Sequence, residues 1–266
     1  MSYENRIALG NLVPTIGQFK VMDKIPQYQQ CEVHNLVEAP AEVPEVLRHV
    51  VFNIERGQTL HETIEKFHDT RKRLADFDKA LERDVKNRAR TCREEIAFVQ
   101  RRREDCAVLM DLLDAGKLPL RVTHNDTKLN NVMLDDVTGR PVAVIDLDTV
   151  MPGLSLYDFG DSIRFGANPA AEDEQDLSKV YCDLNLFEEY TKGFLEECGD
   201  MLTAREIELL PFAAKIMTFE CGIRFLTDHI AGDTYFKIHR EGHNLDRCRT
   251  QFKLVADMEA KMEQMK

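Results

Sequence analysis

The sequence predicts an α+β fold that is mainly helical and carries one small β-hairpin near its middle. Apolar residues recur at intervals of three and four in the segments 96–113 and 245–262, which is the spacing of one buried helix face. Between them, residues 118–147 contain short apolar runs rich in Val and Ile, which favour strands. The change from helical spacing to short β-type runs and back defines the fold class.

Composition and charge exclude several classes of protein. The chain has 266 residues, 43% of them hydrophobic, and no run of eighteen apolar residues, which excludes a membrane span and bulk disorder. Its 47 acidic and 35 basic residues give a formal net charge of -12, the wrong sign for binding nucleic acid through its phosphates. Seven scattered cysteines without a C-x-x-C pair, and an N-terminus without a signal peptide, predict reduced thiols and a cytoplasmic location.

The first 58 residues form a region in which glycines and prolines interrupt every long periodic element. Short strands are expected at 19–25 and 31–37, and a helix at 44–54. Thr59 followed by Glu62 reads as a capping box that opens the first long helix.

The helical pattern continues through the charged stretch 71–103, and Gly116 and Pro119 end it. The residues expected to form its buried stripe are Ile96, Val99, Cys106, Leu109, Met110 and Leu113. Strands are then expected within the runs 118–123, 131–134 and 141–147, with Thr138-Gly139 as the turn of a hairpin between the last two.

The chain is expected to be helical again from Glu172 onward. Thr203 and Glu206 form a second capping box, before a long apolar stretch that ends near Gly232. The last helix is expected to bury Leu245, Cys248, Phe252, Val255, Met258 and Met262.

Polar residues that suit phosphoryl transfer are crowded between the predicted strands. This reaction needs a carboxylate to orient the attacking hydroxyl, and oxygen ligands for a magnesium ion that bridges the nucleotide phosphates. The order His-x-Asp-x-x-x-x-Asn, hairpin, Ile-Asp supplies them: Asp126 would orient the hydroxyl, and Asn131 and Asp146 would hold the metal. Ordinary turn chemistry is the alternative interpretation, because Asp and Asn are common in turns.

The segments 124–131, 145–153 and 158–161 resemble the aminoglycoside phosphotransferase and choline kinase superfamily, whose fold is protein-kinase-like. More narrowly, together with 60–70 and 224–237, they are similar to N-acetylhexosamine 1-kinases. The resemblance implies transfer of the γ-phosphate of ATP, with Mg²⁺, to the anomeric hydroxyl of a free N-acetylated hexosamine. It also implies that Arg224, Asp233 and Tyr235 recognise the sugar.

The same resemblance divides the chain into two parts. Residues 1–58 would be a truncated or divergent N-terminal lobe and hinge, with 19–25 as its last strand or the hinge itself. Residues 59–266 would be the helical C-terminal lobe that carries the catalytic loop and the sugar site. A kinase of this fold holds the nucleotide phosphates with a covering loop and a lysine of the N-terminal lobe. Neither G-x-G-x-x-G nor G-x-x-x-x-G-K-[ST] occurs, and the only lysines before residue 59 are Lys20 and Lys24. Without a phosphate-binding lysine we expect a severe loss of turnover.

Five further residues are expected to support the site. We expect His124 to brace the loop, and Lys128 either to contact a phosphate or to be a solvated loop lysine. The resemblance implies a supporting role for Asp148, as a carboxylate behind the metal ligands or as a second metal contact. Asp158-Phe159-Gly160 spells the magnesium motif of protein kinases, but Asp146 already follows the hairpin directly. Asp158 and Asp161 are therefore expected to cap a helix or to bond the catalytic loop from behind.

Two other functions compete with a sugar kinase. Residues 142–150 also resemble the first motif of haloacid-dehalogenase-type phosphatases, with Asp146 as nucleophile and Asp148 as acid/base, but that fold needs an alternating α/β sheet. The second is a non-catalytic C-terminal lobe, a sugar-binding or interaction module or a gene fragment. The sequence specifies neither which hexosamine is bound nor an oligomeric state.

Overall fold

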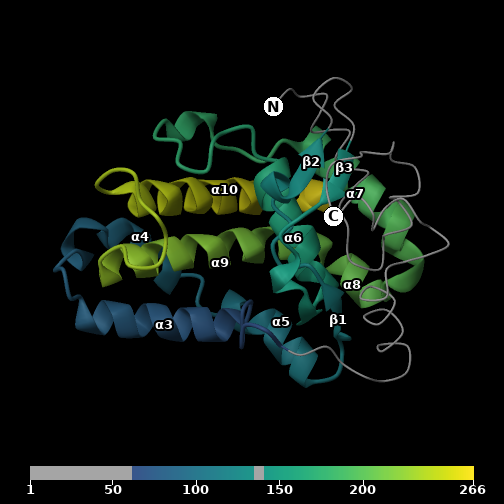
Figure 1. Cartoon of the computed structure of the whole chain (residues 1–266), viewed down its shortest axis with the longest axis horizontal. Coiled ribbons are helices and arrows are strands. Elements are labelled where there is room, and N and C mark those ends of the chain that lie inside the picture. The colour runs from purple at the N-terminus through teal and green to yellow at the C-terminus, as the bar shows by residue number, and fades with distance from the viewer. Residues whose placement is uncertain (1–61, 135–140) are drawn as a thin grey trace.

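The computed structural model describes residues 62–134 and 141–266 (Figure 1). The elements expected at 19–25, 31–37 and 44–54 lie outside these residues, as do Thr59 and the turn Thr138-Gly139. Within the described residues, helices form the body of the molecule and two small antiparallel sheets lie at its side. The mainly helical α+β class is confirmed, and it is consistent with a kinase-like C-terminal lobe.

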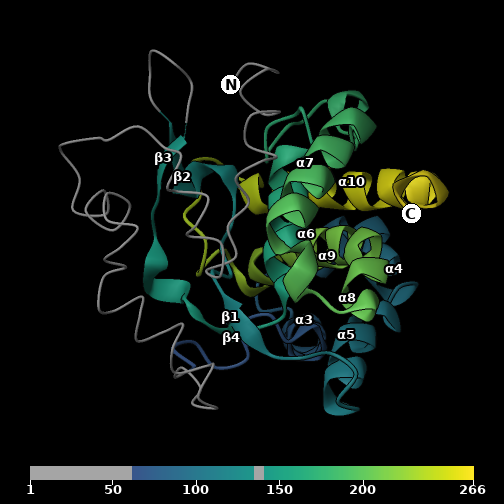
Figure 2. The same cartoon turned by 90° about the vertical axis from the view of Figure 1, so that its right-hand side faces the viewer.

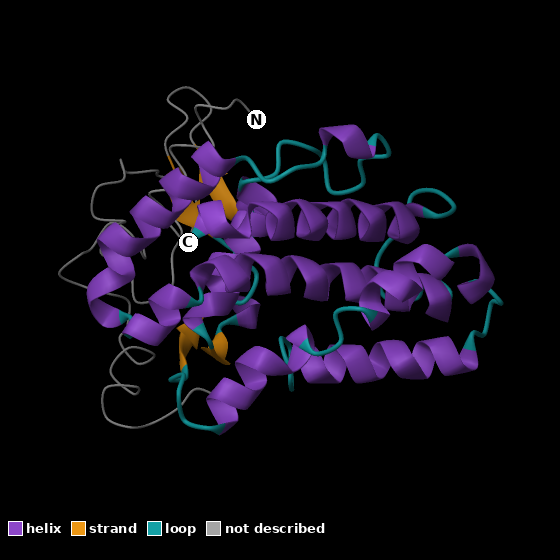
Figure 3. Ribbon diagram, turned by 180° about the vertical axis from the view of Figure 1, so that it is seen from behind, coloured by secondary structure: helices purple, strands orange, loops and turns teal. Residues whose placement is uncertain are grey.

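Three long helices run side by side and build the core. Helix α9 (Leu210–Ala231) lies between α3 (Thr70–Arg83) and α10 (His243–Met265), as Figures 1 and 3 show from opposite sides. Apolar residues occur all around α9, which is the composition of a helix buried on every side. Its Phe219 and Leu226 are fully buried in the core. The predicted end of this helix at Gly232 is confirmed, with a left-handed φ of 107°.

The first helix begins later than predicted. Residues 62–69 form turns, in which Glu62 accepts a hydrogen bond from the Lys66 backbone nitrogen at 2.6 Å. Lys66 has a left-handed φ of 54°, which stops a helix from continuing. Helix α3 opens instead at Thr70, where the Asp69 side chain caps the backbone nitrogen of Lys72 at 3.1 Å.

The charged stretch 71–103 is not one helix. Helix α3 ends at Arg83, and left-handed residues at Asp84 and Asn87 turn the chain toward α4 (Arg93–Gln100) and α5 (Asp105–Asp114). The predicted buried stripe is nevertheless confirmed across α4 and α5, because Val99, Cys106, Leu109 and Met110 are buried and Ile96 and Leu113 pack against the core. Gly116, with a φ of 66°, follows the end of α5 as expected.

Two antiparallel strand pairs flank the helices (Figure 2). The predicted hairpin is confirmed: β2 (Val132–Leu134) pairs with β3 (Pro141–Val144), and Val132 lies opposite Val144. Strand β1 (Arg121–Thr123), inside the predicted run 118–123, pairs with β4 (Met151–Gly153). Strand β4 was not predicted, because it is three residues long and contains Pro152. Together the pairs bring the loop after β1 close to the segment after β3.

Helix α6 (Ser155–Gly166) was also not predicted. Leu156, Phe159 and Ile163 recur in it at helical spacing, but polar and charged residues that are themselves buried interrupt this stripe, and eleven of its twelve residues are buried. Its Gly160 packs directly on the Ala213 carbonyl of α9, where a Cβ atom would have no room. The helix expected from Glu172 begins only at Leu184, where the Asp183 side chain caps α7 (Leu184–Cys198).

The second predicted capping box is confirmed. Thr203 accepts from the Glu206 backbone nitrogen, and Glu206 accepts from the Thr203 nitrogen, at the start of α8 (Ala204–Glu208). In α10, the predicted stripe from Leu245 to Met258 is buried, and Met262 is half-buried.

Two sequence-level exclusions are consistent with the structure. In the part of the chain that the structure describes, no helix has both the length and the apolar character that crossing a membrane requires. Cys92, Cys106, Cys182, Cys221 and Cys248 are free thiols. Burial raises the pKa of Cys106 and of Cys182 to about 12, so neither is a reactive thiolate.

Candidate active site

The loop between β1 and β2 holds Asp126 in a network of polar contacts. One oxygen of its half-buried carboxylate, Oδ2, lies 2.5 Å from Lys128 Nζ and 2.8 Å from Asn131 Nδ2. Burial favours the neutral acid, but the bonds from Lys128 and Asn131 outweigh it and lower the pKa of Asp126 below its usual value. Asp126 is therefore a carboxylate at neutral pH, as an acceptor for a substrate hydroxyl must be.

Asn131 lies between Asp126 and Asp146. Its Nδ2 also donates to the Asp126 backbone carbonyl at 2.8 Å, which fixes the amide orientation and leaves Oδ1 as the atom able to ligate a cation. The Ile145 nitrogen donates to the Asn131 carbonyl at 2.9 Å, so the exposed Asp146 follows immediately beside it. The structure thus brings Asp126 and Asn131 into contact, and the backbone of Asp146 follows the residue that is bonded to Asn131.

His124 braces this loop, as expected. Its Nδ1 accepts from the Asp126 backbone nitrogen at 3.3 Å, so its Nε2 carries the proton and donates to the Ile145 carbonyl at 3.0 Å. The ring therefore ties the loop after β1 to the chain that leads into Asp146.

Asp158 bonds the loop from behind. Its two carboxylate oxygens accept from the backbone nitrogens of His124 at 2.9 Å and Asn125 at 2.8 Å, and its own carbonyl accepts from the Thr127 hydroxyl at 2.6 Å. Complete burial raises the pKa of Asp158 to about 6, although the backbone donors favour its charged form. Asp161 does not reach the loop, because it pairs with Arg164 of the same helix at 2.8 Å.

Two more of the expected residues lie at the edge of the site. Asp148 is exposed, and its backbone carbonyl accepts from the Thr63 hydroxyl at 3.3 Å. Lys128 is about one-third exposed and is committed to Asp126, which is neither of the two roles considered for it from the sequence. Its ion pair instead sets the charge of the carboxylate.

Strand β1, which leads into this loop, is fixed by Glu206. The Arg121 guanidinium forms two hydrogen bonds of 2.7 Å with the Glu206 carboxylate, which also accepts from Ser155 at 2.6 Å. Burial opposes ionisation of Glu206, but Arg121, Ser155 and Thr203 lower its pKa to about 2. One carboxylate thus joins β1, the start of α6 and the cap of α8.

Comparison with known families agrees with this geometry. The phosphotransferase enzyme family matches residues 38–192, more than half of the chain. The chain belongs to this family. The match includes the whole loop 124–131 together with Asp146 and Asp158, and it makes a kinase-type phosphotransferase the coarse identity of the protein.

Membership in the phosphotransferase enzyme family also removes the phosphatase alternative. A haloacid-dehalogenase-type site needs its nucleophile at the end of a strand in an alternating parallel α/β sheet. Here Asp146 follows β3, and β3 belongs to a two-stranded antiparallel pair in the described part of the chain.

A second polar region of this phosphotransferase lies between α3, α9 and the loop after α9. A cavity of about 240 Å³ is lined by Arg224 and Tyr235, two of the residues expected to bind sugar, together with Arg73, Asp76 and Thr227. Tyr235 is 71% exposed and offers its ring to solvent. Asp233 does not line this cavity: it pairs with Arg88 at 2.5 Å and accepts from Asn244 at 2.9 Å.

Sequence reasoning missed a buried acidic residue beneath this cavity. Glu220 is 1% exposed, and its Oε1 lies 3.4 Å from Arg73 Nε and 3.7 Å from Arg224 Nη1. Burial opposes its ionisation, but His68, Arg224 and Arg73 outweigh that effect and lower the pKa of Glu220 to about 2. A single acid within the apolar run 216–223 was the available signal, because a buried carboxylate needs partners.

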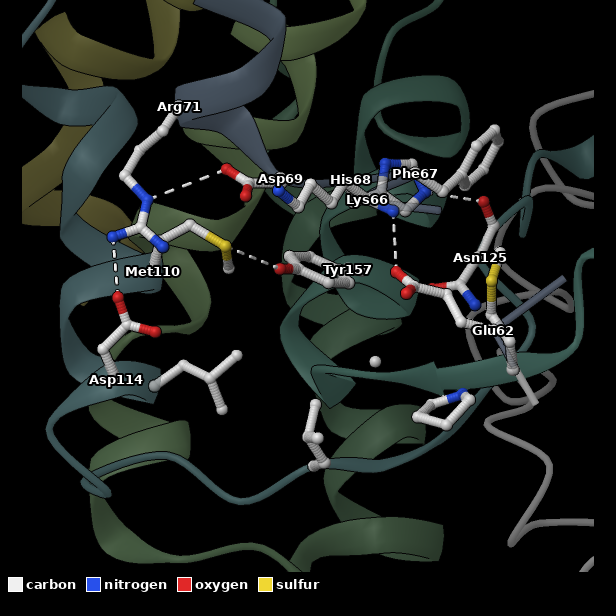
Figure 4. Close-up of a pocket in the computed structure, with 15 residues that line it drawn as sticks. Glu62, Lys66, Phe67, His68, Asp69, Arg71, Met110, Asp114, Asn125 and Tyr157 are labelled. Carbon is white, nitrogen blue, oxygen red and sulfur yellow. Dashed lines mark hydrogen bonds and ion pairs between the residues drawn. The ribbon is translucent and has the colours of Figure 1, made fainter. Parts of the chain in front are cut away.

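A larger cavity of about 500 Å³ lies beside the start of the loop between β1 and β2 (Figure 4). His68 and Asn125 contribute to its wall, with Tyr157 and Met110 among the apolar groups and Arg71 bonded to Asp114 at its rim. Asn125 lines it, whereas Asp126, Asn131 and Asp146 are not among its lining residues.

Proposed function

We propose that the chain is an ATP-dependent sugar kinase that phosphorylates the anomeric hydroxyl of an N-acetylhexosamine. The observation that carries this proposal is the contact of Asp126 with Asn131, with Asp146 positioned next to Asn131 by a backbone hydrogen bond. A charged carboxylate beside two oxygen ligands is the set that phosphoryl transfer requires. The family and the resemblance to N-acetylhexosamine 1-kinases support the sugar as acceptor.

In the proposed reaction, Asp126 accepts a hydrogen bond from the anomeric hydroxyl and aims its oxygen at the γ-phosphorus. The new O–P bond forms as the bond from the γ-phosphorus to the bridging oxygen breaks, so that ADP leaves and the hydroxyl proton passes through Asp126 to solvent. Because its pKa is lowered, Asp126 is a weak base, and orienting the hydroxyl is its main contribution. This suits a loose transition state, in which little proton removal is needed before the phosphoryl group moves.

The residues present fit a magnesium ion. The Asn131 amide oxygen and the exposed Asp146 carboxylate are hard oxygen donors, and Mg²⁺ commonly takes one or two protein oxygens and completes its shell with water and phosphates. When bound, the ion neutralises charge on the nucleotide phosphates.

The proposed sugar site uses Arg224 and Tyr235. The Arg224 guanidinium supplies hydrogen-bond donors for hydroxyl or acetamido oxygens, and the exposed Tyr235 ring offers an apolar face for the pyranose. Asp233 would act indirectly, by holding Arg88 and Asn244 at the loop that presents Tyr235. Lys20 and Lys24, the candidates for binding the nucleotide phosphates, lie outside the described residues. The proposed location is the cytoplasm, which suits free buried thiols.

The reducing end of the sugar provides a direct test. The chain is incubated with ATP, Mg²⁺ and either N-acetylglucosamine or N-acetylgalactosamine, and both ADP formation and the loss of reducing sugar are followed. A 1-kinase consumes reducing ends in proportion to ADP, whereas phosphorylation at any other hydroxyl leaves them intact. ADP without loss of reducing ends would reject the anomeric position, and thermal stabilisation by sugar without any ADP would favour a non-catalytic sugar-binding lobe.

A further inference from the structure

His68 makes two buried hydrogen bonds to groups that lie far apart in the sequence. Its Nδ1 is 3.0 Å from Glu220 Oε2, and its Nε2 is 2.8 Å from the Asn125 carbonyl oxygen. Figure 4 shows His68 beside Asn125, and the ring is 6% exposed. Neither bond belongs to the phosphoryl-transfer groups described above.

The number of protons at these two contacts indicates the charge of the ring. A backbone carbonyl only accepts, and an ionised carboxylate only accepts, whereas a neutral imidazole has a single N–H to donate. Arg73 and Arg224 lie 3.4 and 3.7 Å from the other oxygen of Glu220, and both favour its ionised form. Both ring nitrogens of His68 must then carry protons.

The Asn125 carbonyl belongs to the same rigid peptide plane as the Asp126 nitrogen. Asn125 has a left-handed φ of 66°, which costs about 1 kcal/mol for an L-residue and needs outside support. Its nitrogen is held by Asp158 and its side chain by the Thr149 carbonyl at 3.0 Å, which leaves the carbonyl side of the residue to His68.

We propose that His68 is a positioning residue for Asp126, held as an imidazolium by Glu220 and fixing the peptide plane from which the Asp126 side chain leaves the backbone. The contribution to turnover rests on the proposed function, because it assumes that Asp126 orients the sugar hydroxyl. The Glu220 carboxylate that contacts His68 also contacts Arg224. The proposed sugar cavity and the loop that carries Asp126 therefore share one buried ionic cluster.

Charged and titratable groups from three helices face this ring, in addition to its two partners. Helix α3 contributes Arg73, α9 contributes Arg224, and α6 contributes Asp158 and Tyr157, whose ring centroid is 5.1 Å from that of His68. The two guanidinium groups oppose a charged ring, and Glu220 and Asp158 favour it. The Glu220 contact is the one that a single substitution removes with least change in volume.

The charge of His68 can be measured without substrate. In protein labelled with ¹⁵N-histidine, the His68 nitrogens are assigned by their disappearance in His68→Gln, and their shifts are followed at neutral pH. We expect two N–H-type resonances in the wild-type protein, and one N–H-type and one pyridine-type resonance in Glu220→Gln. A pyridine-type nitrogen for His68 in the wild-type protein overturns the imidazolium.

Kinetics test the positioning role, with His239→Gln as the matched control because His239 is an exposed histidine. In folded His68→Gln, we expect kcat to fall about 10- to 100-fold while KM for ATP stays within about threefold, because misplacing a reacting group slows the chemical step. In Glu220→Gln, we expect kcat to fall as well, because the ring loses the carboxylate that holds it against the Asn125 carbonyl. Wild-type kcat in both variants overturns the proposal.

A second readout keeps this inference separate from the sugar kinase proposal. The backbone amide resonance of Asp126 should shift in His68→Gln and stay unchanged in His239→Gln, whether or not the protein turns over substrate. If the wild-type protein forms no sugar-dependent ADP, the proposed function fails, and the amide resonance still decides whether His68 positions Asp126. An unchanged Asp126 resonance in His68→Gln contradicts it.

Discussion

Asn131 donates from its side-chain nitrogen to the Asp126 carboxylate over 2.8 Å, and five positions of loop separate the two residues. The bond stabilises the charged form of Asp126 and assigns the Asn131 amide nitrogen to it, so that the amide oxygen is the atom able to ligate a cation. One hydrogen bond therefore prepares both halves of the proposed site, the acceptor for a hydroxyl and the ligand for a cation.

The first prediction concerns Asp146 and magnesium. In the wild-type protein, ATP with Mg²⁺ should raise the melting temperature more than ATP alone, because a ligand that binds only the folded state stabilises it. Asp146→Asn should remove most of the increment due to Mg²⁺, and Asp200→Asn, at an exposed position, should keep it. Equal increments in both variants, measured by differential scanning fluorimetry, would remove Asp146 from the metal site.

The second prediction concerns the acid side of the activity profile. Lys128 lowers the pKa of Asp126, so Lys128→Met should raise it and move the acid limb of kcat/KM to higher pH. Lys117→Met, at an exposed position after α5, should leave that limb in place. The initial rate of sugar-dependent ADP formation across pH gives the comparison, and coincident limbs for all three proteins would contradict the ion pair.

The third prediction links Glu206 to acid stability. Its pKa of about 2 in the folded protein lies below the value near 4.3 of an unfolded Glu, so the folded state gains stability above pH 4.3 that is lost as the pH falls toward 2. Glu206→Gln should cost about 3 kcal/mol at pH 7 and less than half of that at pH 3. Urea unfolding at both pH values tests this, and a pH-independent difference would show that the charge is not the cause.

The fourth prediction concerns the contact between α6 and α9. A Cβ atom at Gly160 would overlap the Ala213 carbonyl and the Met217 side chain, so Gly160→Ala should destabilise the fold by about 1–3 kcal/mol. At Gly199 a Cβ atom would lie 3.9 Å from its nearest neighbour, the Leu195 side chain, and Gly199→Ala should change stability by less than about 1 kcal/mol. Equal unfolding free energies for the two variants would mean that the helices can separate freely.

Local patterns allowed much of the fold and of the site to be predicted. The capping box of Thr203 and Glu206, the hairpin of β2 and β3, and the bracing bond of His124 all involve neighbours in sequence or across one turn. Asp126 and Asn131 could be predicted as partners for the same reason. The helix expected to run through residues 62–69 is absent there, because a left-handed residue at Lys66 is not visible in residue spacing.

Contacts between distant segments could not be predicted. His68 and Glu220 are 152 positions apart, and each reads in isolation as an ordinary polar residue. The polar residues of helix α6 are buried because they have partners that residue spacing does not reveal: Asp158 binds the loop and Asp161 pairs with Arg164. A buried residue whose partner is distant in the sequence leaves no local pattern. The same is true of Asp233, which pairs with Arg88 and does not line the cavity of Arg224 and Tyr235.

The most direct test of the proposed site is the turnover of Asp126→Asn, measured as ADP formed per enzyme in the presence and absence of N-acetylhexosamine. The substitution keeps the shape of the side chain and removes the charge, and near-ultraviolet circular dichroism confirms that the fold is retained. We predict that sugar-dependent ADP formation falls by about 100-fold or more, the usual contribution of a positioned acid or base. Turnover equal to that of the wild-type protein would contradict the assignment of Asp126 and, with it, the proposed phosphotransfer site.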